Sequence, residues 1–283
     1  MTRFLSGKRL TILAAASISL VILLRAAGNT LENSVFSISG MAGCLLAIWL
    51  CLAVARDHRR GSFLRTAWLL FSGDAFMQFF RYFMDSPVGQ RAIPEAATRD
   101  HYRALFVLIG LIFLLAGMMV LWLGLKRMGL GLRLLTRDIA TLSCLGFFAV
   151  VVAIAEITRI GWTLRTPILA CMVAGAIVGA MLLRFARQIA EGQIYLVIQM
   201  LIAYLGSRCI QNLFIASGLA GGAAIGIVVL SLQTALPWIL CIGAAARLRV
   251  TLGAEERLEN IRRLEFGARS VPAAGRIQPN SPV

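Results

Sequence analysis

Histidine and lysine are nearly absent from this sequence: His58, His101, Lys8 and Lys126 are the only ones in 283 residues. A retinal protein needs a lysine inside a late membrane span, whereas both lysines here lie at the ends of apolar runs. Haem held between helices usually needs paired histidines, but these two fall on opposite sides of the membrane in the threading given below. The scarcity of both residue types argues against a rhodopsin and against a b-type cytochrome.

Acidic residues and metal-binding patterns are also scarce. The chain has 13 Asp and Glu residues, and the predicted inner loops hold only isolated acids such as Asp57, Asp138 and Glu191. Metal-dependent membrane enzymes cluster their His, Asp or Glu ligands, and neither a D-x-x-D pair nor a glycine-rich phosphate loop is found. We therefore predict no metal site, no cofactor and no catalytic residue, and we expect that the chain is not an enzyme.

The six cysteines form neither a metal-binding nor a disulfide pattern. All of them fall inside apolar runs, and no two are spaced as C-x-x-C. A thiol among apolar neighbours behaves as a small hydrophobic group. We expect neither disulfide bonds nor a zinc site.

Hydrophobic residues, in contrast, are abundant. They make up 59% of the chain, charged residues make up 14%, and the mean hydropathy is +0.82. A soluble domain is about half apolar and about a quarter charged. The excess falls in runs of about 20 residues, the length of helix that crosses a hydrocarbon core of about 30 Å. The sequence predicts an all-α, polytopic integral membrane bundle of about eight transmembrane helices, at residues 9–26, 34–55, 64–84, 104–125, 139–157, 165–184, 193–213 and 223–246.

The basic residues predict the orientation of these spans. The net charge is +15, but the arginines lie in short clusters between apolar runs, which favours the lipid bilayer over nucleic acid as the partner. With the N-terminus inside, most of the 28 Lys and Arg residues fall on the cytoplasmic side, as the positive-inside rule requires. Tyr82, Tyr102 and Trp162 then fall at outer span ends, where aromatic belts lie. We predict an N-in, C-in, multi-pass protein of a cell membrane, with a bacterial inner membrane expected.

A second interpretation exists for the first span. A basic start followed by an apolar run is also typical of a cleaved signal peptide. The run is long for that role, Arg25 lies where small residues should precede cleavage, and no A-x-A sequence follows. An uncleaved span is favoured; cleavage would leave seven spans with the N-terminus outside.

Polar residues interrupt the third span, in the sequence FSGDAFMQFFRYFMD (71–85). Asp74 lies nine residues from Arg65 at the inner end, about 13 Å at the rise of a helix and close to the middle of the bilayer. A charge at this depth costs at least about 2.5–3.5 kcal/mol and normally faces protein or water. Spacings of four and three place Asp74, Gln78 and Arg81 on one helix face. Packing alone explains Gln78 and Arg81 well, whereas for Asp74 a structural and a functional role are equally open.

The seventh and eighth spans hold candidate partners for Asp74. In YLGSRCIQN (204–212), Tyr204, Arg208 and Gln211 share one face. In the eighth span, Pro237 removes a backbone donor and leaves a carbonyl of the preceding turn unpaired. We predict that spans three, seven and eight enclose one polar cavity, open or nearly open to the outside. The predicted ligand-binding residues are Asp74, Gln78, Arg81, Tyr204, Arg208, Gln211, Asn212, Gln233 and Thr234.

The C-terminal part of the chain predicts a separate element. Residues 247–266 have apolar residues at helical spacing, with charged residues around them, which is typical of an amphipathic helix on the cytoplasmic side. Such a helix can lie on the inner leaflet or contact a protein partner. Residues 267–283 are expected to be disordered.

Three functional hypotheses follow from these features. The first is a non-catalytic membrane protein, sensor-like or scaffold, whose polar cavity takes a small ligand or a partner and whose tail contacts a second protein. The alternative is a small-solute transporter that uses Asp74 as the buried ionisable group. The third is a membrane enzyme that acts on lipid-linked substrates, for which the sequence offers the fewest suitable residues.

Overall fold

The computed structural model describes residues 7–127, 163–189, 193–216 and 221–269 together with six isolated positions between 147 and 158. Every regular element in the part of the chain so described is helical, and no strand occurs there. The chain divides into two compact units, Met1–Leu248 and Arg249–Val283. The helices are α1 (Gly7–Ala26), α2 (Glu32–Arg56), α3 (Phe63–Asp85), α4 (Pro87–Ala92), α5 (Ala96–Arg127), α7 (Arg165–Ile189), α8 (Gln193–Ala216) and α9 (Ala223–Arg269).

Local sequence determines where α3 begins and ends. Gly61 adopts a positive φ of 84° before the helix, and Ser62 then caps it by accepting a hydrogen bond from the backbone N–H of Arg65 (3.2 Å). At the other end, Ser86 accepts a hydrogen bond from the N–H of Gly89 (3.1 Å) and Pro87 occupies the first turn of α4. A serine cap and a proline in the first turn are both favourable at a helix start, so the α3 boundaries follow from the sequence.

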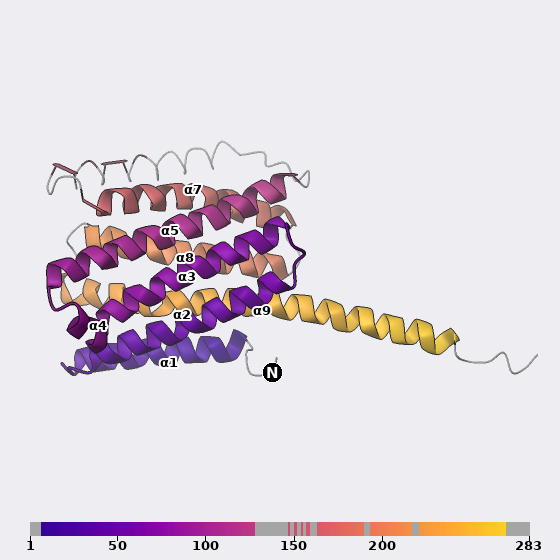
Figure 1. The fold of residues 1–283 in the computed structure, drawn as a ribbon, viewed down its shortest axis with the longest axis horizontal. Helices are drawn as coiled ribbons and strands as arrows, with labels where there is room; N and C mark the ends of the chain where they lie inside the picture. Colours follow the sequence, from indigo (N-terminus) through magenta and orange to yellow (C-terminus); the bar gives the residue numbers. More distant parts are fainter. Residues whose placement is uncertain are drawn as a thin grey trace, which may run out of the picture. The chain divides into compact units, whose positions relative to one another are not determined.

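The helices of the first unit pack as a row with a second layer behind it (Figure 1). Along the row, α1 contacts α2, α2 contacts α3, α3 contacts α5, and α5 contacts α7. In the figure, α8 lies behind the row between α5 and α3, and the first part of α9 lies behind it between α3 and α2. The third helix is therefore surrounded by α2, α5, α8 and α9.

Glycines at a spacing of seven join α5 to α3. A Cβ at Gly117 would lie 2.6 Å from the Phe71 ring, and a Cβ at Gly124 would collide with the Phe63 ring. A Cβ at Gly110 would lie 2.6 Å from Asp74 Oδ1 and 3.1 Å from Gln78 Nε2. Small residues on one face let helices approach closely in lipid, so this row of glycines lets large and polar side chains of α3 lie against the α5 backbone.

Five of the described helices are long and apolar enough to cross a membrane: α1, α2, α5, residues Arg165–Leu182 of α7 and residues Ala223–Arg249 of α9. This agrees with an all-helical, multi-pass membrane protein. The helices α3 and α8, of 23 and 24 residues, are not among these five, which were sought only within the described residues. Most of the predicted span 139–157 lies outside those residues. The count of eight spans and the N-in, C-in orientation stay predictions.

The C-terminal prediction differs from the structure in one respect. The sequence separates a span at 223–246 from an amphipathic helix at 247–266, but α9 is continuous from Ala223 to Arg269. Residues 247–252 (RLRVTL) contain no glycine or proline, so no helix-breaking residue occurs at the expected junction. The predicted disordered segment 267–283 begins inside α9, and its remainder lies outside the described residues.

Candidate functional site

Asp74 forms the centre of a buried polar cluster between α3 and α8. It is the middle residue of α3, and 0% of its surface is exposed. Arg208 donates from Nη1 to Asp74 Oδ1 at 2.6 Å, and Tyr204 donates from its hydroxyl to Asp74 Oδ2 at 2.6 Å. Tyr204 and Arg208 lie one turn apart on α8 and are both about 1% exposed. Both carboxylate oxygens therefore accept a short hydrogen bond from the neighbouring helix.

The chemistry of this cluster makes it a strong but costly connection. Hydrogen bonds between ionised partners are short and roughly twice as strong as neutral ones. Burying both charges removes their hydration, so the pair contributes little net stability over an apolar contact. Removing one partner is different, because the remaining charge is then buried alone, at a cost of about 3–5 kcal/mol. The cluster thus fixes how α3 and α8 meet more than it stabilises the bundle.

A polar stripe extends from Asp74 along α3 toward α4. Gln78 and Arg81 are 3% and 4% exposed, and Arg81 donates from Nη1 to Gln78 Oε1 across a long 3.4 Å. The Gln78 Nε2 atom is buried and has no hydrogen-bond partner. At the end of the stripe, Asp85 Oδ1 lies 3.0 Å from Nε of Arg103 on α5. The stripe therefore runs from a fully paired carboxylate to a more exposed ion pair.

Tyr82 connects α3 to α9 at the proline of that helix. Pro237 has no N–H, so the carbonyl of Gln233, four residues earlier, loses its helical partner. The Tyr82 hydroxyl donates to this Gln233 carbonyl. The Tyr82 ring is 0% exposed and packs so closely on Gly40 of α2 that a Cβ there would collide with it. The position of Tyr82 near a span end predicts a place in an interfacial aromatic belt, and that prediction is wrong because the ring is buried among three helices.

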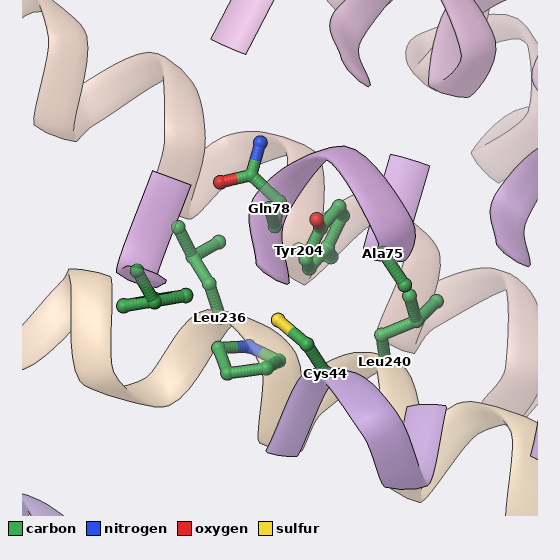
Figure 2. Close-up of a pocket in the computed structure, with 8 residues that line it drawn as sticks. Cys44, Ala75, Gln78, Tyr204, Leu236 and Leu240 are labelled. Carbon is green, nitrogen blue, oxygen red and sulfur yellow. The ribbon is translucent and has the colours of Figure 1, made fainter. Parts of the chain in front are cut away.

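A small apolar space lies beside the cluster (Figure 2). It is too narrow to hold a water molecule. Figure 2 shows Cys44 and Leu236 on one side of it, with the Gln78 amide turned away from them. The lining residues are Cys44, Ala75, Gln78, Tyr82, Tyr204, Leu236, Pro237 and Leu240. In this conformation the polar side chains contact one another and the backbone, so an incoming ligand requires a rearrangement of the site.

The remaining predicted site residues serve their own helices. Asn212 donates from Nδ2 to the Arg208 carbonyl at 2.8 Å, and Thr234 donates to the Leu230 carbonyl at 2.8 Å. Gln211 and Gln233 are 3% and 9% exposed. The structure thus brings Asp74, Tyr204 and Arg208 together, while Asn212 and Thr234 bond to carbonyls one turn earlier on their own helices. Ligand binding by any of these residues stays a prediction.

Three neighbours of the site were missed by the sequence analysis. Gly110 carries no polar signal, although its spacing of seven from Gly117 was visible in the sequence. Asp85 lies eleven residues after Asp74 and extends the same helix face. Tyr82 was recognisable only through its partner, the carbonyl that Pro237 leaves without an N–H. Together they extend the site to α5 and α9.

Metal binding has little support in the part of the chain that the structure describes. No group of three or more His, Cys, Asp or Glu side chains there could hold a metal ion. Cys44, Cys51, Cys171 and Cys241 are free thiols, and Cys241 donates to the Gly43 carbonyl at 3.2 Å. The polar side chains of the site are the carboxylate of Asp74 together with arginine, tyrosine and amide groups.

Comparison with known proteins gives no relative of this chain: no family model, no curated protein and no solved structure matches it.

Proposed function

We propose that this chain is a non-catalytic, multi-pass membrane protein that acts as a sensor-like or scaffolding component. The polar site among α3, α8 and α9 takes a small ligand or a neighbouring protein, and the C-terminal segment contacts a partner. The observation that carries this proposal is the buried Asp74 carboxylate, held by Tyr204 and Arg208 of α8 at 2.6 Å each. Ionisable groups inside a membrane are expensive and usually mark function.

The contacts around α3 supply a two-state element. In the closed state, Asp74 is bonded to α8 and Tyr82 is bonded to the Gln233 carbonyl of α9. A ligand that binds better when α3 and α8 separate would shift the population toward the separated state. Any such shift would also strain or break the Tyr82 contact, because Tyr82 lies two turns from Asp74 on the same helix. This supports transmission of a binding event to α9.

In this conformation Asp74 is closed to water, so transport, like ligand binding, would require the site to open. A carboxylate that carries an ion or proton across a membrane must exchange it with water, but both Asp74 oxygens already accept hydrogen bonds. The adjacent space admits no water molecule. We further propose the N-in, C-in orientation with eight spans in a bacterial inner membrane, in which the basic turn at Arg56, Arg59 and Arg60 faces the cytoplasm.

Partner capture by the full-length protein tests this function. The tagged wild-type chain is purified from its native membrane beside a chain that lacks residues 249–283 and beside Asp74→Asn. We expect a stoichiometric partner with the wild type, loss of that partner on truncation, and a clear change in its yield with Asp74→Asn. Ile112→Ala is the matched control, because Ile112 is 51% exposed and its change should leave capture as in the wild type.

Reconstitution into proteoliposomes separates the sensor from the two alternatives. Accumulation of a solute that is lost in Asp74→Asn would contradict the proposed function and support a small-solute transporter. Turnover of a lipid-linked substrate by the purified chain would support the third hypothesis, a membrane enzyme. Equal partner capture by the wild type and Asp74→Asn would also count against sensing at this site.

A further inference from the structure

Arg81 is a buried cation that forms no ion pair among the described residues. It lies one turn before the end of α3 and is 4% exposed. No described carboxylate forms an ion pair with it within the 4.0 Å that defines one. Its hydrogen bond to Gln78 Oε1 is 3.4 Å long, and its guanidinium carbon lies 5.4 Å from the centre of the Tyr82 ring. The described residues give its other N–H groups no hydrogen bond, and none of its nitrogens is among the fully buried atoms that lack a partner.

An arginine in this position should have a stronger partner. The guanidinium keeps its charge at all relevant pH values and presents five N–H donors in a planar fork. A buried charge without a partner is costly, and inside membranes such groups are almost always paired. A long hydrogen bond to an amide oxygen and a cation–π contact with the face of one aromatic ring do not replace an ion pair.

The neighbouring carboxylates are paired with other arginines. Asp74 is bonded to Arg208 and Tyr204, and Asp85 Oδ1 lies 3.0 Å from Arg103 Nε. Arg81 interacts electrostatically with Arg103 and Arg208 as well as with Asp85. Arg81 and Arg208 are the two buried arginines, and Asp74 and Asp85 are the two mostly buried carboxylates, so their charges are equal in number. Neither carboxylate, however, forms an ion pair with Arg81 within 4.0 Å. Asp100 also pairs with Arg103, but it is 68% exposed, so its charge is largely screened by water.

We propose that Arg81 binds an oxyanion, a carboxylate or phosphate group, with the Gln78 amide as the second donor. The Gln78 Nε2 atom is buried without a partner, and it belongs to the amide whose oxygen accepts from Arg81. Figure 2 shows this amide directed away from the apolar space lined by Cys44 and Leu236. A planar fork matches two oxygens of a carboxylate or phosphate. That this oxyanion is the ligand of the site rests on the proposed function. Its binding to Arg81 can be measured whether or not that function holds.

Asp85 sets the accessibility and the strength of this site. Its side chain is 16% exposed, which places the end of the stripe near the surface at α4. Its Oδ2 atom has no hydrogen-bond partner and lies on the same helix face one turn beyond Arg81. A negative Asp85 repels an incoming oxyanion, so its neutralisation should tighten binding. If Asp85 were instead the counter-ion of Arg81, its neutralisation would weaken the protein and bring no new affinity.

Thermal unfolding of the purified full chain in detergent tests oxyanion binding. Sodium phosphate and sodium acetate are titrated against sodium chloride at constant ionic strength, and the unfolding midpoint is followed. Because a ligand that binds the folded state raises the midpoint by mass action, we expect a rise with one oxyanion and none with chloride. Arg81→Gln should weaken the apparent affinity by at least about tenfold. Arg91→Gln is the matched control, since Arg91 is exposed at the same end of the bundle.

Bound phospholipid, measured as phosphorus per chain, identifies the source of the oxyanion. If no soluble oxyanion raises the midpoint, but Arg81→Gln retains less phospholipid than Arg91→Gln, the ligand is a lipid headgroup and the inference stands. Equal midpoints and equal phosphorus in Arg81→Gln and the wild type would overturn it.

A second variant keeps the inference testable if Arg81→Gln does not fold. Asp85→Asn should increase oxyanion affinity or phospholipid retention; destabilisation without either gain would assign Asp85 as the counter-ion and overturn the inference. Oxyanion binding without any effect on partner capture would leave this inference intact while contradicting the proposed function, so the two failures are distinct.

Discussion

Asp74 and Arg81 are two charged residues on the same helix face, and the bundle treats them differently. Asp74, in the middle of α3, has both oxygens bonded to α8 at 2.6 Å. Arg81, two turns later, has one long bond to its neighbour on the same helix. Both side chains are more than nine-tenths buried. The difference shows that a buried charged side chain need not have all its hydrogen bonds satisfied. Asp74, in the middle of the stripe, has a partner for each oxygen, whereas Arg81, near its end, has one long hydrogen bond.

The largest expected effect is the loss of Arg208. Arg208→Leu leaves the Asp74 carboxylate buried without a charge partner, which should reduce the free energy of unfolding by about 3–5 kcal/mol. Denaturant titration of the purified protein in detergent measures this reduction in the free energy of unfolding. Arg25→Gln is the control: Arg25 pairs with Glu32 at 3.1 Å but is 40% exposed, and such a pair is worth about 0–1 kcal/mol. Equal losses of unfolding free energy in the two variants would show that the buried Asp74–Arg208 pair matters no more than the exposed Arg25–Glu32 pair.

A smaller effect is expected at the glycine that faces Asp74 and Gln78. Gly110→Ala places a Cβ 2.6 Å from Asp74 Oδ1, and overpacking of this kind costs about 1–3 kcal/mol. Gly206→Ala is a matched control in α8, because nothing lies within 4 Å of its Cβ. Its change should be neutral or stabilising by roughly 0.5–1 kcal/mol. A tolerated Gly110→Ala would mean that α5 does not confine the middle of the stripe.

Tyr82→Phe tests the contact of α3 with α9. The change keeps the ring against Gly40 but leaves the Gln233 carbonyl without a donor, because Pro237 cannot supply one. A buried unsatisfied carbonyl costs about 1–3 kcal/mol, and we expect a loss at the lower end, since the ring packing remains. The same denaturant titration measures it. An unchanged free energy of unfolding would show that another group satisfies this carbonyl.

The smallest effect concerns a titrating group outside the spans. Partial burial, followed by the nearby Arg247 charge, lowers the pKa of His58 in the α2–α3 turn below 6.5, and the nearby Asp57 opposes this shift. Below about pH 6.5 the unfolded chain binds a proton that the folded chain does not. Stability should therefore fall as pH decreases from 6.5 toward the lower folded pKa, and His58→Gln should flatten this part of the profile. An unchanged profile would contradict the assignment.

The helices could be predicted from the sequence because each apolar run is bounded by charges or turn residues. The predicted span 34–55 and α2 (Glu32–Arg56) differ by two residues or fewer at each end. Arg208 could be named from the sequence as a candidate partner, since a mid-span carboxylate needs one. Its expected depth was nearer that of Gln78 and Arg81, so its contact with Asp74 depended on how the helices face one another.

The parts that could not be predicted depend on packing in three dimensions. A tyrosine near a span end is typical of an interface, and only its position against Gly40 and Gln233 shows that Tyr82 is buried. Gly110 matters because its lack of a side chain lets Asp74 and Gln78 lie against the α5 backbone. A pattern of polar residues in the sequence does not indicate such a position. The two predicted C-terminal helical segments lie on one continuous helix, α9, because no helix-breaking residue occurs between them.

A double-mutant cycle between Asp74 and Arg208 tests the central claim most directly. The free energy of unfolding is measured for the wild type, Asp74→Leu, Arg208→Leu and the double variant. If the two side chains form the buried pair, the double variant should be more stable than either single variant, with a coupling of about 2 kcal/mol or more. Additive losses, with the double variant the least stable of the four, would contradict the pairing of α3 with α8 on which this account rests.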